Sequence, residues 1–84
     1  PDEGVLERSD TDARFALAAV LWNENVTVDE AARCLALPAA TVAPRLERLR
    51  EAGVLVREQQ RYRVATAWWS MVLRFLRRKH LIDD

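Results

Sequence analysis

Apolar positions recur along the chain at intervals that change several times, and these intervals predict four helices and one hairpin. The first set has the three-to-four-residue spacing of one helical face and consists of Phe15, Ala18, Ala19 and Trp22. Ser9 precedes this stretch as a candidate N-cap, with Asp12 three residues further on. We therefore predict a helix over residues 11–24 and place Trp22 in the core.

A second, shorter helix is predicted over residues 28–36. Thr27 and Glu30 have the spacing of a capping box, and Asp29 adds negative charge to the first turn, where the helix dipole favours it. The apolar positions form one stripe, which indicates packing against the core: Val28, Ala31, Ala32 and Leu35. Cys34 lies among these apolar neighbours with no base near it in the sequence, so we expect a small buried side chain.

The beginning of the third helix depends on the position that Pro44 takes in it, whereas Gly53 marks its end. Its buried face is predicted to hold Val42, Leu46 and Leu49. Gly53 can adopt the left-handed conformation that stops a helix. A helix beginning directly after Pro38 would place Pro44 in its second turn, at a cost of about 3 kcal/mol. With Thr41 as N-cap, Pro44 falls in the first turn, where its missing N–H needs no partner, so we expect a start near residue 42.

The last third of the chain predicts a hairpin and one more helix. Apolar and polar residues alternate over residues 54–64, as in a two-stranded hairpin, but the tip lacks the Asn-Gly of the tightest turns, which leaves its turn type open. A helix follows over residues 67–81. Its apolar face spans roughly 200°, at about 100° per residue, which is broader than one core seam needs. Its arginines lie opposite that face.

Composition and charge limit the size and class of the protein. The 84 residues suffice for one domain, which we divide into a flexible N-terminal segment (1–10), a core (11–66) and a C-terminal amphipathic helix with its tail (67–84). The net charge is zero, which argues against strong nucleic-acid binding. The distribution is uneven, because residues 1–56 carry ten acidic and six basic side chains, whereas residues 57–80 carry one acidic and seven basic.

Residues suited to catalysis or metal binding are scarce. One cysteine, one histidine and two glycines cannot supply an internal disulfide, a zinc site or a glycine-rich phosphate loop. We therefore predict a protein that is not an enzyme and uses no cofactor or metal. No apolar run approaches the length that crosses a bilayer, and the cysteine usage fits a reducing compartment, so we expect a cytoplasmic location without membrane contact.

The order of elements resembles the winged helix-turn-helix superfamily, especially repressors of the multiple-antibiotic-resistance and arsenic-response types. The likeness is carried by three groups of positions: Thr27, Glu30 and Ala31; Thr41, Val42, Leu46 and Leu49; Gly53 and Val54. It implies a mainly α fold of three helices and a β-hairpin wing, here with an added C-terminal helix. As this superfamily serves DNA binding, RNA binding and protein docking alike, the fold alone does not fix the function.

The resemblance implies a double-stranded DNA interface on the third helix and wing, as in transcription regulators. The candidate contacts are Thr41, Arg45, Arg48, Arg57, Arg61 and Arg63. The early third helix departs from DNA-reading relatives, because its surface positions are mostly alanine and proline. No Asn, Gln or Lys is present there to form a bidentate base contact, and Arg45 is the one candidate reader. Base reading should therefore be poor.

A second hypothesis is a docking or dimerising winged helix within a larger, bacterial-type multidomain protein. It rests on the alanine-rich third helix, the zero net charge and the tryptophan-rich last helix. Trp68 and Trp69 are adjacent and point about 100° apart, so they cannot both face one small core. With Phe75, they are the candidate contacts to a protein partner or a second copy through the C-terminal helix.

Overall fold

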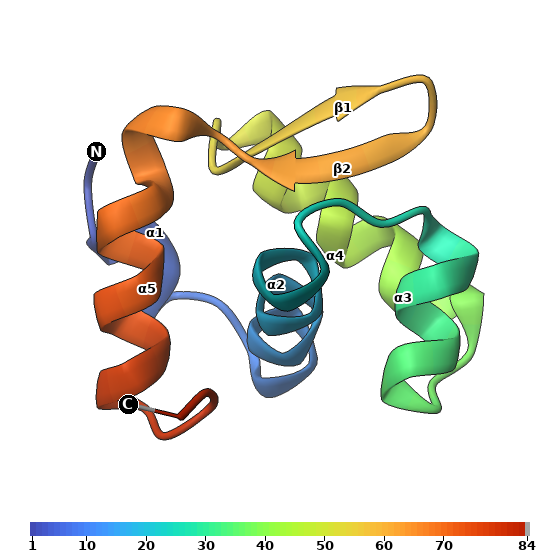
Figure 1. Cartoon of the computed structure of the whole chain (residues 1–84), viewed down its shortest axis with the longest axis horizontal. Helices are drawn as coiled ribbons and strands as arrows, with labels where there is room; N and C mark the ends of the chain where they lie inside the picture. The colour runs from blue at the N-terminus through green and yellow to red at the C-terminus, as the bar shows by residue number, and fades with distance from the viewer. Residues whose placement is uncertain (84) are drawn as a thin grey trace.

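The computed structural model describes residues 1–83, which form five α-helices, a 3-10 turn and one two-stranded antiparallel sheet. In chain order the elements are α1 (Gly4–Glu7), α2 (Thr11–Asn23), α3 (Val28–Leu35), α4 (Ala39–Glu51), β1 (Leu55–Glu58), β2 (Arg61–Val64), η1 (Thr66–Trp68) and α5 (Trp69–Arg78). Figure 1 shows α2 between α5 on one side and the α3–α4 pair on the other, with the hairpin crossing above. The predicted fold, three helices and a wing followed by a C-terminal helix, is confirmed.

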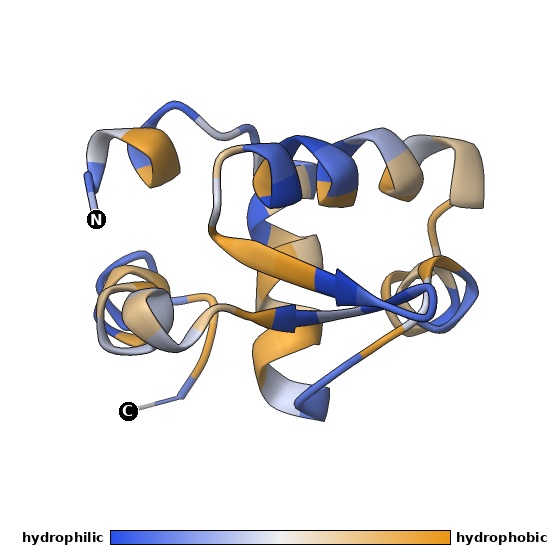
Figure 2. Cartoon of the chain, turned by 90° about the horizontal axis from the view of Figure 1, so that it is seen from above, coloured by the Kyte–Doolittle hydropathy of each residue, from blue (hydrophilic) through white to orange (hydrophobic). Residues whose placement is uncertain are grey.

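One hydrophobic core joins all of these elements. Its largest fully buried side chains come from α1, α2, α4, α5 and the start of β1: Leu6, Leu17, Leu46, Leu55, Phe75 and Leu76. Apolar segments of the helices turn toward the centre in Figure 2, and the hydrophilic segments turn outward. Because α2 contacts α3, α4, α5 and β2, it is the element on which the others are assembled.

The N-terminal residues differ from the predicted flexible segment. Gly4–Glu7 forms a short helix, and Leu6 is completely buried in the core. The burial of this one side chain gives the segment a fixed position. Residues 1–10 have no periodic apolar pattern from which this could be predicted. The cap of α2 also differs, because the Asp10 carboxylate, and not the Ser9 hydroxyl, accepts the hydrogen bond from the Ala13 N–H, at 2.8 Å.

Trp22 is not a core residue, contrary to prediction. Its side chain is 77% exposed, and Phe15 on the same face of α2 is 42% exposed. The buried face of α2 is instead formed by alanine, leucine and valine: Ala13, Ala16, Leu17, Val20 and Leu21. As the helix is apolar on nearly every side, spacing alone could not distinguish its inner face from its outer one.

The α3 helix begins as predicted and differs at Cys34. The Thr27 hydroxyl accepts from the Glu30 N–H at 3.1 Å, and the Glu30 carboxylate accepts from the Thr27 N–H at 3.0 Å, which completes the capping box. Cys34 is exposed, because the buried stripe of this short helix consists of Ala31 and Ala32. The expectation of a buried thiol was therefore wrong.

The α4 helix begins at Ala39, three residues before the predicted start. The Pro38 carbonyl accepts from the N–H groups of Thr41 and Val42, at 2.9 and 3.2 Å, so Pro38 and not Thr41 is the N-cap. Pro44 therefore lies inside the helix. The carbonyl that it leaves without an N–H partner belongs to Ala40, whose side chain is exposed, so water can satisfy that oxygen.

The junction between α4 and the wing follows the sequence closely. Gly53 has a φ of 87°, and the N–H groups of Gly53 and Val54 donate to the carbonyls of Arg50 and Leu49, both at 3.0 Å. This is a Schellman motif, in which a left-handed glycine closes the helix. Val54 is fully buried directly after it, so the chain enters the wing from a fixed point.

The hairpin closes through a two-residue turn at Gln59 and Gln60. Strand pairs run from Leu55 opposite Val64 to Glu58 opposite Arg61, and both glutamines have positive φ angles, 51° and 68°. Positive angles at both central residues define a type I′ turn, which settles the turn type that the sequence left open. Backbone hydrogen bonds of 2.7 and 2.9 Å between Val26 and Tyr62 attach β2 to the loop before α3.

Candidate nucleic-acid interface

The surface proposed from the sequence consists of α4 and the two wing strands, and Glu47 connects them. The Glu47 carboxylate accepts from Arg50 of the same helix at 2.9 Å and from Arg57 of β1 at 3.0 Å. It also accepts the hydroxyl hydrogen bond of Tyr62 on β2. Three donors around one carboxylate hold the wing against α4.

The electrostatic effect on Glu47 is large. The hydrogen bond from Arg50, then that from Tyr62, lowers the pKa of the Glu47 carboxyl from 4.5 to about 2. Burial and the same Glu47 contact raise the pKa of the Tyr62 phenol. Glu47 is therefore ionised and Tyr62 is protonated at neutral pH, which is the pair of states that this hydrogen bond requires.

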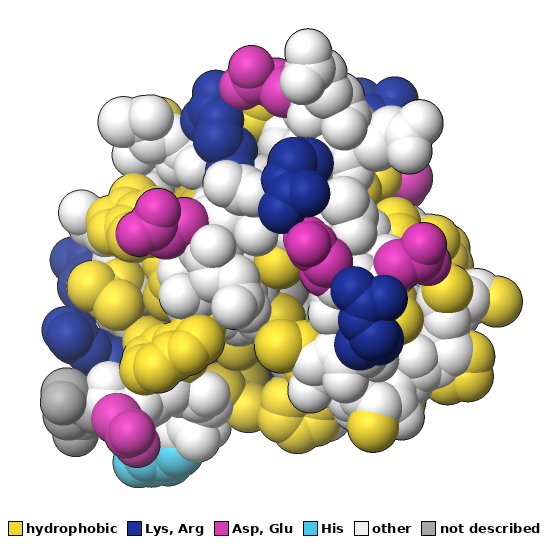
Figure 3. Space-filling view, turned by 45° about the vertical axis from the view of Figure 1, so that its right-hand side comes forward, with side chains coloured by type: hydrophobic (Ala, Val, Ile, Leu, Met, Phe, Trp, Pro, Cys, Tyr) yellow, Lys and Arg dark blue, Asp and Glu magenta, His cyan; other side chains and the backbone are white. Residues whose placement is uncertain are grey.

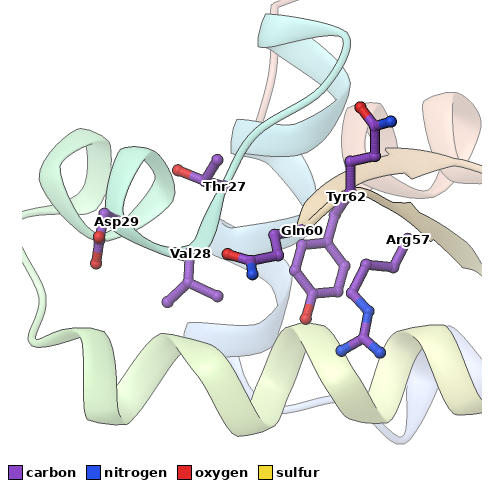
Figure 4. A pocket seen from close by; sticks show the side chains of 7 residues that line it. Thr27, Val28, Asp29, Arg57, Gln60 and Tyr62 are labelled. Carbon is purple, nitrogen blue, oxygen red and sulfur yellow. The ribbon is translucent and has the colours of Figure 1, made fainter.

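A hollow of about 660 Å³ lies between the start of α3 and the wing tip. Figure 4 shows Thr27, Val28 and Asp29 along one side, with Gln60 and Tyr62 opposite and Arg57 below the wing. Its two sides differ in charge, because Asp29 is acidic and Arg57 is basic. This hollow could not be predicted from the sequence, since the α3 start and the wing tip lie about thirty residues apart in the chain.

The other two wing arginines are paired with carboxylates. Arg61 lies 2.8 Å from Glu30 and donates to the Asn25 side chain at 2.7 Å, while Arg63 lies 2.8 Å from Glu58. The Thr27 N–H, aided by Arg61, lowers the pKa of Glu30. Although Arg61 and Arg63 share the outward face of β2, as predicted, their partners lie in different directions. Both side chains remain almost half exposed.

Arg45, the candidate base reader, is also engaged. It forms an ion pair with Asp10 at 3.0 Å and donates to the Thr41 carbonyl at 2.7 Å. The hydrogen bond from Arg45, followed by that from the Ala13 N–H, lowers the pKa of Asp10. Arg45 and Arg48 line a smaller hollow of about 260 Å³ with residues from the N-terminal segment. The Arg45 guanidinium is thus directed toward the start of α2.

The six predicted contact residues do not form a single positive patch. Arg57 joins the Glu47 cluster, Arg61 approaches α3, and Arg45 approaches α2. Arg48 is exposed and has no carboxylate within ion-pair distance among residues 1–83. Basic and acidic side chains alternate over the face in Figure 3. The sequence could not show this neutralisation, because most of the pairs join residues far apart in the chain.

The predicted protein-contact residues are divided between core and surface. Phe75 is fully buried, and Trp68 is 8% exposed with its indole nitrogen beside Gly53. The Arg14 guanidinium covers the Phe75 ring at 5.1 Å from its centre. A contact surface that uses Phe75 or Trp68 does not fit this packing, whereas Trp69 is 41% exposed and stays available.

Within residues 1–83 there is no cluster of three or more His, Cys, Asp or Glu side chains that could hold a metal ion. No helix in that same part of the chain has the length and apolar character needed to cross a membrane.

The elements around this surface define a winged helix-turn-helix protein: α3 and α4 form the helix-turn-helix, and β1 and β2 form the wing. A solved structure with a similar fold is described as a MarR family protein from Bacillus stearothermophilus. It superposes with a TM-score of 0.65 at 20% sequence identity, over 92% of the present chain. The chain spans 61% of that protein's length. At this identity the likeness shows the fold.

Comparisons at the level of sequence gave no match. No protein-family model and no curated protein matches the chain. The structural likeness is therefore carried by the arrangement of helices and wing, with few shared residues.

Proposed function

We propose that the chain is a double-stranded DNA-binding module of a cytoplasmic regulatory protein. The observation that carries the proposal is the exposure of three arginines on the wing, next to α4. Arg57, Arg61 and Arg63 are each about 45% exposed, and Arg48 is exposed on α4. In this fold, an α4-type helix faces the major groove and the wing approaches phosphate or the minor groove.

The ion pairs reduce the affinity of such a surface and do not abolish it. An exposed ion pair contributes about 0 to 1 kcal/mol, so a phosphate can replace a carboxylate as the partner of an arginine. The displaced carboxylate then stays close to the negatively charged backbone. Few counterions are therefore released on binding, so we expect weak binding with a shallow dependence on salt.

Base reading has little support on this surface. The exposed positions in the first two turns of α4 are Ala39, Ala40 and Pro44. Methyl groups and a proline ring can contact a thymine methyl group, but they cannot form the paired hydrogen bonds that distinguish guanine or adenine. Binding should accordingly differ little between duplexes of different sequence.

The test is a fluorescence-anisotropy titration of the chain with a random-sequence duplex at two salt concentrations. We expect binding that weakens with salt, and an Arg61→Ala/Arg63→Ala variant that binds more weakly and has a smaller salt slope. Arg74→Ala/Arg77→Ala is the matched control, because it removes two exposed arginines from α5 and should leave binding unchanged. No binding at low salt, or equal losses in both variants, would contradict the proposal.

A second candidate function, protein docking, is favoured by one specific observation. The exposed start of α4 is small and apolar and includes no hydrogen-bonding side chain among Ala39, Ala40 and Pro44. Such a surface suits close packing against another protein better than it suits phosphate. Absence of duplex binding at low salt would favour this function over the first.

A further inference from the structure

The turn at the wing tip contains two residues that its backbone conformation does not favour. Gln59 and Gln60 have φ angles of 51° and 68°, in the region where the Cβ atom of any residue other than glycine crowds the backbone. Type I′ turns are therefore formed mainly by Asn-Gly, Asp-Gly or Gly-Gly. Turn chemistry gives no reason for two glutamines here, and residues held in such conformations collect at functional sites.

Both glutamine side chains are available to a partner. They are exposed, and within residues 1–83 neither carboxamide takes part in a hydrogen bond, whereas the flanking Glu58 and Arg61 both do. The closed end of the hairpin lies on the α3 side of the molecule, away from α5 (Figure 1). In Figure 4 the Gln60 side chain extends over the hollow toward Val28. Since no hydrogen bond holds it there, it can turn toward an outside partner.

A carboxamide has the hydrogen-bonding groups that the minor groove of DNA calls for. There an A·T pair presents only acceptors, adenine N3 and thymine O2, while a G·C pair adds the guanine 2-amino donor. Asparagine and glutamine are among the side chains with which proteins make this distinction. Antiparallel strands lie roughly 4.8 Å apart, so the narrow two-residue tip can approach a groove about 6 Å wide.

We infer that Gln59 and Gln60 give the wing a preference for A·T pairs in the minor groove of a bound duplex. The inference rests on the proposed DNA-binding function and deepens it, because the exposed start of α4 has no comparable side chain. Arginines next to the tip contact phosphate in any sequence, so they supply affinity without preference. The preference is small, since a carboxamide oxygen can also accept from the guanine amino group.

The test is a fluorescence-anisotropy titration at low salt with three duplexes of equal length and alternating sequence, built from A·T, G·C or inosine·cytosine pairs. Inosine lacks the guanine 2-amino group, so its pair with cytosine resembles A·T in the minor groove and G·C in the major groove. Alternating sequences avoid A-tracts, whose minor groove is narrow for other reasons. The A·T and inosine·cytosine duplexes should bind alike, and the G·C duplex about three- to fivefold more weakly.

Two variants of the tip separate the carboxamides from the stability of the turn. Gln59→Gly/Gln60→Gly supplies residues that the turn favours, so its melting temperature should be at least that of the original chain, while the A·T preference disappears. Gln59→Ala/Gln60→Ala keeps the unfavourable turn and should lose the preference as well. Arg61→Ala/Arg63→Ala is the matched control, because it should weaken binding to all three duplexes by the same factor and keep the preference.

Three results would overturn the inference and leave the DNA-binding proposal in place. They are equal binding of the three duplexes by the original chain, a preference that survives in both glutamine variants, and an inosine·cytosine duplex that binds as weakly as G·C. The last result would assign the preference to the major groove. Absence of binding to every duplex would overturn the DNA-binding proposal together with this inference, so the two failures are distinguishable in one set of titrations.

Discussion

At the scale of single residues, the wing is held on the helix by one ionised carboxylate. Glu47 accepts hydrogen bonds from Arg50, Arg57 and Tyr62, and these donors stabilise its charged form. The pKa of Glu47 is about 2 in the folded chain, compared with an ordinary value of 4.5. A carboxyl whose pKa is lower in the folded state contributes stability above its unfolded pKa, and this contribution is lost as the pH falls.

Glu47→Gln should therefore lower the melting temperature at neutral pH. The difference from the original chain should shrink as the pH falls from 4.5 toward 2, the two pKa values of Glu47, because the original carboxyl becomes protonated over that range. Thermal unfolding followed by circular dichroism at several pH values measures this. Glu51→Gln is the control, since Glu51 is exposed on the same helix, and its effect should be small. A Glu47→Gln deficit that persists unchanged at pH 2 would contradict the explanation.

Features that depend on a few adjacent residues were predictable from the sequence, whereas the burial of side chains that depends on distant segments was not. The Thr27–Glu30 capping box and the left-handed Gly53 were both confirmed, because each depends on a few adjacent positions. The burial of Trp22 and Cys34 was predicted wrongly. Their exposure depends on which face of an apolar helix the rest of the chain covers.

At the scale of elements, α4 forms a continuous helix although Pro44 lies inside it. Pro44 removes one hydrogen bond from the second turn, yet the helix begins at Ala39 and keeps Val42, Leu46 and Leu49 buried. Burial of those three side chains against the core outweighs the cost of one exposed carbonyl. A prediction that considers only the cost of the proline therefore places the start of the helix too late.

Pro44→Ala should stabilise the chain. We expect an increase in the free energy of unfolding of about 1 to 3 kcal/mol, since the roughly 3 kcal/mol penalty of an interior proline is partly offset by the stiffer unfolded chain that proline gives. Urea denaturation measures the change. Pro38→Ala is the matched control, as Pro38 is the N-cap and its N–H is not required by the helix. Equal effects of the two substitutions would show that the position of Pro44 does not matter.

At the scale of the whole molecule, charge balance governs the candidate interface. The chain is neutral, and carboxylates from the N-cap of α2, from α3 and from the wing form ion pairs with arginines of the candidate interface. Pairs such as Arg57–Glu47, Arg61–Glu30 and Arg78–Glu3 also bring the acidic first part of the sequence against the basic second part. The arginines of the candidate interface remain exposed, but the neighbouring carboxylates reduce the positive potential of this surface.

Removing two of these carboxylates should strengthen DNA binding. Asp10→Asn/Glu58→Gln releases Arg45 and Arg63 from their partners, and asparagine retains the N-cap of α2. We expect several-fold tighter binding to a random duplex at low salt and a salt slope that is steeper by about 1 to 2. Asp83→Asn is the control, because it removes an exposed carboxylate near Trp22 and Leu81, away from α4 and the wing, and should have no effect. Unchanged binding of the double variant would mean that these pairs do not limit affinity.

The sequence by itself determined the order of helices and wing, the α3 cap and the stop at Gly53, since these depend on local spacing and backbone conformation. The tertiary structure decided the rest. It fixed the early start of α4, brought Leu6 into the core and left Trp22 outside, because burial depends on packing among segments that are distant along the chain. It also decided which arginines are neutralised, since the ion pairs from Asp10 and Glu30 span 35 and 31 residues, and only the folded chain brings these charges together.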